Sequence, residues 1–73
     1  MKFYIKHSMT GRLRVHMDMK HMSFKQADIL EYYIKNIETV TSVKVYEKTC
    51  DAVIEFKGDK AQIINELKHF TYS

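Results

Sequence analysis

The chain has 73 residues, a hydrophobic content of 45% and a formal net charge of +3. A chain this short predicts one domain, residues 1–73, with a small core. Its one cysteine, Cys50, excludes an internal disulfide, and no paired Cys/His spacing suggests structural zinc. A lone thiol fits a reducing compartment. No signal peptide is recognised, and no apolar run approaches the roughly 20 residues of a membrane span, so we expect a cytoplasmic protein.

The positive charge is concentrated towards the amino terminus. Residues 1–25 carry six lysine or arginine side chains and one acidic side chain, whereas residues 26–73 carry six basic and eight acidic ones. The two segments therefore have net charges of +5 and −2. This distribution predicts a polarised surface, for which a merely solvated face is the alternative interpretation.

Residues 1–19 alternate between apolar odd positions and polar even positions. Because successive strand residues point to opposite faces, the pattern predicts a half-buried strand whose odd positions, His7 among them, face the core. One straight strand of this length would span roughly 60 Å at about 3.3 Å per residue, so we expect a bend or bulge near Gly11. A hairpin that turns through residues 8–11 is the alternative.

A helix is predicted to begin at a capping box formed by Ser23 and Gln26. The Ser23 hydroxyl can accept a hydrogen bond from the backbone N–H of Gln26, whose side chain can reach back to the cap. The helix should end near residues 36–38. Its apolar stripe consists of Ala27, Leu30, Ile34 and Ile37, with Tyr33 beside it.

Two more strands and a second helix follow. Residues 40–47 and 52–56 alternate again, and residues 48–51 join them as a short hairpin loop. Their inward side chains are expected to be Val43, Val45, Ala52, Ile54 and Phe56. Asp59 caps the second helix, whose apolar side consists of Ile63, Ile64, Leu67 and Phe70.

The order of elements is β-α-β-β-α, with residues 70–73 as a possible short final strand. This order predicts an α+β, ferredoxin-like β-α-β-β-α-(β) sandwich, in which two helices cover one face of an antiparallel sheet.

Three short motifs, in their order and spacing, resemble one subgroup of heavy-metal-associated (HMA) domains. His7–Val15 contains His-x-x-Thr-Gly-Arg-x-Arg and resembles the subgroup's opening His-x-x-Pro-Gly-Arg-x-Arg. Val40–Val45 resembles its second strand, and Lys48–Phe56 resembles its hairpin and third strand. The likeness covers about His7 to Leu67. The chain departs from the family pattern at two positions: Thr10 replaces a frequent proline, and Thr41 replaces the usual glycine.

This subgroup lies at the amino termini of heavy-metal-transporting P-type ATPases. The resemblance therefore implies a non-catalytic, regulatory domain of such a transporter, or a free-standing relative, whose partner is the rest of the ATPase or its acidic surface. Better-known HMA domains carry Cys-x-x-Cys before the first helix, where this chain has Ser23 and Gln26. Neither residue can supply a thiolate, so we expect docking with weak metal binding at most, to an ion such as Cu, Zn or Fe.

Residues 16–22 contain three candidate metal ligands, His16, His21 and Met22. Thioether and imidazole donors suit Cu(I), and imidazole also suits Zn or Fe. Core packing is the favoured interpretation of the methionines, because the two within the strand pattern fall on inward positions and Met22 directly precedes the helix cap. If metal binds here, His21 and Met22 are the best ligands, helped by His16.

A basic stripe is predicted on the outward face of the first strand. Arg12 and Arg14 are two positions apart and should project side by side, next to Lys6 and His16. Such a stripe suits acidic side chains, phosphates or lipid headgroups, and the alternative interpretation is that these exposed arginines are merely solvated. Together with the motif residues, the candidate docking residues are His7, Gly11, Arg12 and Arg14.

We find no catalytic constellation: there is no glycine-rich phosphate loop, no nucleophile with an identifiable base and no suitable carboxylate pair. Cys50 is interpreted as a chance thiol, with an intermolecular metal bridge or disulfide as the alternative.

RNA-recognition motifs share the order of elements but stack bases on aromatic residues. In this chain the corresponding strand is expected to present Val53 and Glu55 outward instead of aromatic rings, which argues against nucleic-acid binding. Nucleic-acid binding is therefore only the second hypothesis. A purely structural oligomerisation domain is the third.

Overall fold

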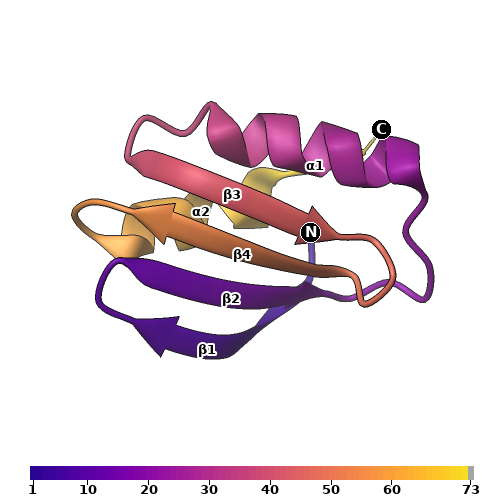
Figure 1. The fold of residues 1–73 in the computed structure, drawn as a ribbon, viewed down its shortest axis with the longest axis horizontal. Coiled ribbons are helices and arrows are strands. Elements are labelled where there is room, and N and C mark those ends of the chain that lie inside the picture. The colour runs from indigo at the N-terminus through magenta and orange to yellow at the C-terminus, as the bar shows by residue number, and fades with distance from the viewer. Residues whose placement is uncertain (73) are drawn as a thin grey trace.

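The structure, a computed structural model, describes residues 1–72 and consists of one four-stranded antiparallel sheet and two helices (Figure 1). The elements are β1 (Phe3–Met9), β2 (Arg12–Met17), α1 (Phe24–Lys35), β3 (Val40–Tyr46), β4 (Asp51–Phe56) and α2 (Lys60–His69). The strand order in the sheet is β1-β2-β4-β3. The predicted α+β, ferredoxin-like class is confirmed.

The connectivity places the amino-terminal strand where a ferredoxin-like fold would have its last one. β2, α1 and β3 form a split β-α-β unit with β4 inserted between its two strands. After α2, a final strand would lie beside β2, but β1 already occupies that position. Residues 70–72 form no strand, and Ser73, the last residue of the predicted final strand, lies outside the described residues.

The prediction of one long strand over residues 1–19 is wrong. β1 and β2 form a hairpin that turns through Thr10 and Gly11, as in the alternative interpretation. Gly11 has a φ of +77°, which a residue without a Cβ adopts easily. The hairpin also resolves the length problem, because the longest dimension of the molecule is 30 Å.

A β-bulge in β1 changes which side chains face the core. Ile5 pairs with Val15, but His7 pairs with Arg14, so Lys6 is the extra residue. The sequence predicted a bend or bulge near Gly11, but the bulge lies at Lys6. The inward position predicted for His7 is wrong as well: His7 is exposed and lies opposite Arg14.

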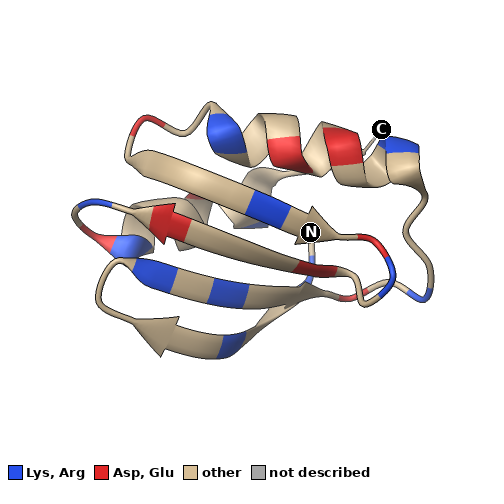
Figure 2. Ribbon diagram, viewed as in Figure 1, with Lys and Arg blue, Asp and Glu red and all other residues tan. Residues whose placement is uncertain are grey.

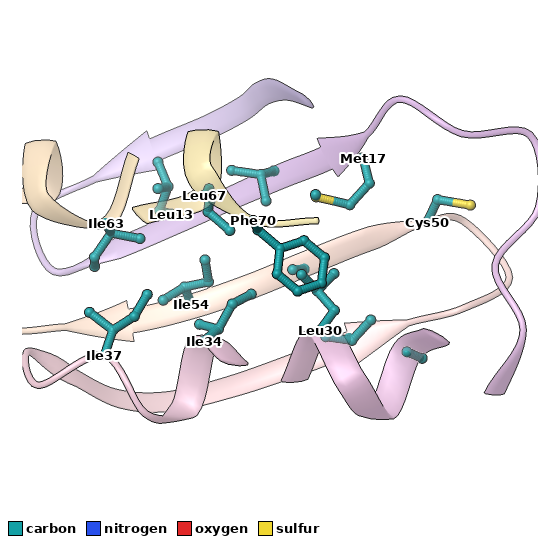
Figure 3. Packing of buried hydrophobic residues seen from close by; sticks show 14 of the residues in the cluster. Leu13, Met17, Leu30, Ile34, Ile37, Cys50, Ile54, Ile63, Leu67 and Phe70 are labelled. Carbon is teal, nitrogen blue, oxygen red and sulfur yellow. The ribbon is translucent and has the colours of Figure 1, made fainter. Parts of the chain in front are cut away.

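The core lies between the sheet and the two helices (Figure 3). Leu13, Val15 and Met17 of β2 are fully buried, as the alternation predicted. Phe70, which follows α2, packs against Tyr33 of α1 with ring centroids 4.8 Å apart. The remaining buried hydrophobic residues are Met22, Ala27, Leu30, Ile34, Ile37, Val45, Cys50, Ala52, Ile54, Phe56, Ile63 and Leu67.

Both helices begin at the predicted caps. The Ser23 hydroxyl accepts from the Gln26 N–H at 3.0 Å, and the Ser23 N–H donates to the Gln26 side chain at 2.9 Å, which completes the capping box. In α2, the Asp59 carboxylate accepts from the Ala61 N–H at 2.9 Å. α1 ends at its C-cap Asn36, within the expected range.

Candidate docking site on the open sheet face

The sheet face away from the helices, called the open face here, carries most of the cationic groups of the strands. Strand pairing places β2 residues Arg12, Arg14 and His16 on it, because they alternate with the buried Leu13, Val15 and Met17. Figure 2 shows basic positions on β1, β2 and β3 and acidic positions on the central strand β4. The other open-face residues are Tyr4, Lys6, His7, Met9, Ser42, Lys44, Tyr46, Asp51, Val53 and Glu55.

Asp51, the first residue of β4, gathers three of these basic side chains around one carboxylate. Lys6 donates from Nζ to Oδ2 at 3.1 Å. Arg14 donates to the same oxygen from Nη2 at 3.0 Å and from Nε at 3.3 Å. His16 Nδ1 lies 2.8 Å from Oδ1. We call these four residues the Asp51 cluster.

The cluster presents positive charge outward and hides its negative charge. The Asp51 side chain is fully buried, whereas the side chains of Lys6, Arg14 and His16 are 49%, 42% and 35% exposed. Burial alone would raise the pKa of the Asp51 carboxyl, but the hydrogen bonds from His16, Arg14 and Lys6 outweigh burial and lower it to about 2. Asp51 is therefore ionised at neutral pH and holds its basic partners at fixed positions in the sheet.

Two tyrosine rings flank the cluster on the outer strands. The Arg14 guanidinium lies 5.9 Å from the ring centroid of Tyr46, and Lys44 Nζ lies 5.8 Å from the same centroid. On the other side, the ring of Tyr4 is stacked with that of His16 at 6.2 Å. Tyr4 and Tyr46 are 59% and 41% exposed, so flat apolar surface is available beside the charges. Chemically, this arrangement can bind an anionic group and pack against an apolar one.

The structure brings three of the four docking residues predicted from the sequence onto this face. Arg12 is exposed and lies opposite Glu55, while Arg14 and His7 are paired across β1 and β2. Gly11 has a structural position in the turn between these strands, where its carbonyl accepts from the Phe56 N–H at 3.0 Å.

The structure places the three candidate metal ligands in different surroundings. Met22 is 1% exposed and belongs to the core, as the favoured interpretation predicted. His16 is held by Asp51, and His21 is exposed in the segment before α1. Within residues 1–72, no group of three or more His, Cys, Asp or Glu side chains is arranged to hold a metal ion. Since Ser23 and Gln26 are engaged in the capping box, the residues present do not fit the thiolate-bound metal of better-known HMA domains.

Cys50 is a buried residue and not a surface thiol. The residue is 4% exposed, and its Sγ lies 3.8 Å from the carbonyl oxygen of Glu47. Burial, and to a lesser degree the neighbouring Asp51 carboxylate, raises the pKa of the Cys50 thiol. The neutral, enclosed thiol is unsuited to an intermolecular bridge.

The residue at the centre of the site, Asp51, was not among the candidates predicted from the sequence. Asp51 was predicted to lie in the hairpin loop, but it is the first residue of β4 and shares the outward phase of Val53 and Glu55. The outward phase of this acid was the available signal, but sequence alternation alone does not show that the strand with three outward basic residues lies beside it. Tyr46 and Lys44 were missed because sequence alternation shows that a residue points outward but not which strand lies beside it.

No helix in the described part of the chain is both long and apolar enough to cross a membrane. Comparisons with protein-family models, with curated proteins and with solved structures found no match.

Proposed function

We propose that this protein is a non-catalytic docking domain that binds an acidic protein surface through its open face. We propose further that the partner belongs to a heavy-metal-transporting P-type ATPase, either in the same chain or as a separate protein. The ATPase context rests on the resemblance to HMA domains, whereas the acidic partner and the surface rest on the geometry of the site. On this account the domain works at the cytosolic side of the transporter and regulates it by docking, without carrying the metal.

The Asp51 cluster is the observation that supports docking most strongly. A buried carboxylate with three partly exposed basic partners holds those partners in place before any ligand arrives. Side chains that are already ordered lose less conformational entropy on binding than free surface lysines and arginines. Arg14 in particular retains donors that are not used by Asp51, and Arg12 and Lys44 extend the positive surface on either side.

A nucleic-acid interface is the second candidate, and the exposed rings of Tyr4 and Tyr46 favour it. Bases would stack on such rings, and the neighbouring basic side chains would bind phosphates. However, both tyrosines lie on the outer strands, while the central strand β4 presents Val53 and the exposed acid Glu55. A continuous phosphate backbone that crosses the sheet would pass over this carboxylate, whereas a protein surface can place its separate acidic side chains beside the basic residues and away from Glu55, so we prefer a protein partner.

The proposal is tested by adding the purified ATP-binding and actuator domains of a heavy-metal-transporting P-type ATPase, from the same source, to the ¹⁵N-labelled protein. We expect amide shifts that concentrate on open-face residues such as Lys6, Arg14 and Lys44. Buried residues of α1, for example Leu30, serve as internal controls because docking should leave them unchanged. Absence of shifts with both domains would overturn the ATPase assignment.

A parallel titration with single-stranded RNA of mixed sequence separates the two candidates. On our account, RNA binds more weakly than the acidic protein domain at about 0.15 M salt. Tighter RNA binding, with an affinity that falls steeply as salt is raised, would replace our proposal with the second candidate.

A further inference from the structure

The two edges of the sheet differ in how their backbone groups are satisfied. At the β3 edge, α1 packs alongside the strand, and the Glu31 carboxylate accepts from the outward Val45 N–H at 3.2 Å. At the other edge, no element of the described chain lies beside β1 (Figure 1). An edge of this kind can pair with another chain.

The register shows which backbone groups of β1 are free. The Lys2 carbonyl accepts from the Asp18 N–H at 3.0 Å, so the backbone groups of Lys2 point towards β2. Backbone groups of successive strand residues point to opposite sides, and therefore those of Phe3 and Ile5 point away from β2, towards solvent. The bulge at Lys6 interrupts this pattern and restricts regular pairing to the first half of the strand.

The side chains of these same residues line an apolar groove. A groove of about 630 Å³ between β1 and α2 is lined by the apolar residues Met1, Phe3, Ile5 and Ile64, by Tyr4, and by the charged residues Lys2, Asp18 and Lys68. Ile5 is 47% exposed there, so β1 has apolar surface that the chain itself does not cover. A strand added beside β1 would place every second side chain next to this groove.

We propose that β1 binds an extended segment of the docking partner by strand addition. This inference rests on the proposed function and specifies its mode of binding. The segment has alternating apolar and acidic residues: its apolar side chains pack on Phe3 and Ile5 over the groove, and its acidic ones face the open side near Lys6 and His7. Main-chain hydrogen bonds to Phe3 and Ile5 supply affinity, while the basic residues of β1 select the charge of the segment.

The charge of β1 argues for this occupant and against a second copy of the chain. β1 carries Lys6 and His7 and no acidic residue, and it follows Lys2. Antiparallel pairing of two copies of β1 would bring these basic groups close together, and the bulge would interrupt the ladder near its middle. An acidic segment instead gains from the same charges.

The test uses NMR with the capped peptide Val-Glu-Val-Glu-Val-Glu at millimolar concentration. We expect the amide protons of Phe3 and Ile5 to move downfield and to exchange at least tenfold more slowly with solvent, while Val45 at the opposite edge is unchanged. Ile5→Pro removes an outward N–H without touching the pairing with β2, and proline is tolerated at such edge positions. It should abolish the peptide effects, and the matched variant Ile5→Val should retain them.

If Ile5→Pro fails to fold, Ile5→Lys places a charge at the groove, keeps the N–H and should weaken peptide binding at least fivefold.

Strand addition is overturned if the peptide leaves the Phe3 and Ile5 amides unchanged. It is also overturned if the free protein is a dimer by light scattering with these amides already protected. Loss of ATPase-domain docking in Arg12→Glu but not in Ile5→Pro would overturn strand addition and leave the proposed function standing. If the protein binds neither the peptide nor the ATPase domains, both strand addition and the proposed function are overturned.

Discussion

At the scale of single residues, Asp51 determines the character of the open face. It is fully buried and ionised, and its interactions are made with side chains from β1 and β2 that are distant in sequence. A buried charge with good partners stabilises a fold only if the partners compensate for its lost hydration. The lowered pKa of Asp51 indicates that they do.

Asp51→Asn should therefore lower the free energy of unfolding at pH 7 by about 2 kcal/mol, the linkage equivalent of a carboxyl pKa that falls on folding from 3.8 to about 2. A carboxyl pKa depressed in the folded state contributes stability above its unfolded value, and this contribution disappears as the pH falls through the folded value. The difference between wild type and variant, measured by urea unfolding, should shrink from its full value above pH 4 towards zero near pH 2. A difference that stays constant over this range would contradict the assignment.

Gly11 and Gly58 provide a second comparison at this scale. Both have a positive φ, +77° and +89°, but a Cβ at Gly11 would lie 3.3 Å from the Phe56 carbonyl oxygen, whereas a Cβ at Gly58 would meet nothing within 4 Å. Gly58→Ala should cost about 1 kcal/mol from backbone strain alone, and Gly11→Ala roughly 2 kcal/mol because the hairpin must also shift against β4. Equal losses in thermal or urea unfolding would show that the contact with Phe56 is unimportant.

At the scale of elements, the helices, β3, β4 and the core were predictable from the sequence, but the first hairpin was not. The capping residues Ser23 and Asp59 and the apolar stripes are local signals, so they located both helices correctly. The alternation over residues 1–19 was misleading for a physical reason. The two-residue turn pairs Met9 with Arg12, which opposes odd and even positions, and the bulge at Lys6 then restores odd-to-odd pairing. Because of the turn and the bulge together, the hairpin has the same alternation of apolar and polar residues as one uninterrupted strand.

The sequence could also predict the basic stripe, because Lys6, Arg12, Arg14 and His16 depend only on outward phase. It could not predict their convergence on Asp51, which requires knowing that β4 lies next to β2. Strand order is a property of the tertiary fold, and local alternation contains no information about it.

The first turn of α1 gives a prediction about metal binding. The side chains of Ser23 and Gln26 satisfy the helix cap, and the resemblance to HMA domains implies that these two residues stand where better-known members carry their thiolate pair. The double substitution Ser23→Cys, Gln26→Cys should create a Zn(II) site at least a hundredfold tighter than any in the wild type. It should also destabilise the metal-free protein by about 1 kcal/mol through loss of the cap.

Isothermal titration under reducing conditions measures the gain, and unfolding of the metal-free variant measures the loss. The variant Ser23→Ala, Gln26→Ala is the control, because it loses the cap without gaining thiols. If the double cysteine variant binds Zn(II) no better than this control, the alignment with the HMA metal loop is incorrect.

At the scale of the whole molecule, the sheet separates two surfaces of different character. The helices cover one face and form the core with it. The other face carries the Asp51 cluster, Arg12 and Lys44, and Figure 2 shows basic positions on β1, β2 and β3. The fold thus leaves uncovered the face on which the basic strand residues gather, and the free edge of β1 borders that face.

If charge attraction steers docking, the affinity for the ATPase domain should depend on ionic strength. Raising salt from about 0.05 to 0.5 M should weaken binding roughly tenfold or more, because exposed charges are screened over a shorter distance. Surface plasmon resonance should show that most of the change is in the association rate. Binding that is independent of salt would indicate an apolar interface elsewhere, for example on the helices.

The most direct test of the account compares two charge reversals with the same chemistry on opposite sides of the molecule. Arg12→Glu changes an exposed residue of the open face, and Lys25→Glu changes an exposed residue in the first turn of α1, where a carboxylate is favourable for the helix. The measurement is the dissociation constant of each folded variant for the acidic ATPase domain. We predict at least a tenfold loss of affinity for Arg12→Glu and less than a twofold change for Lys25→Glu. Equal losses in both variants, or a loss confined to Lys25→Glu, would contradict the assignment of the open face as the docking surface.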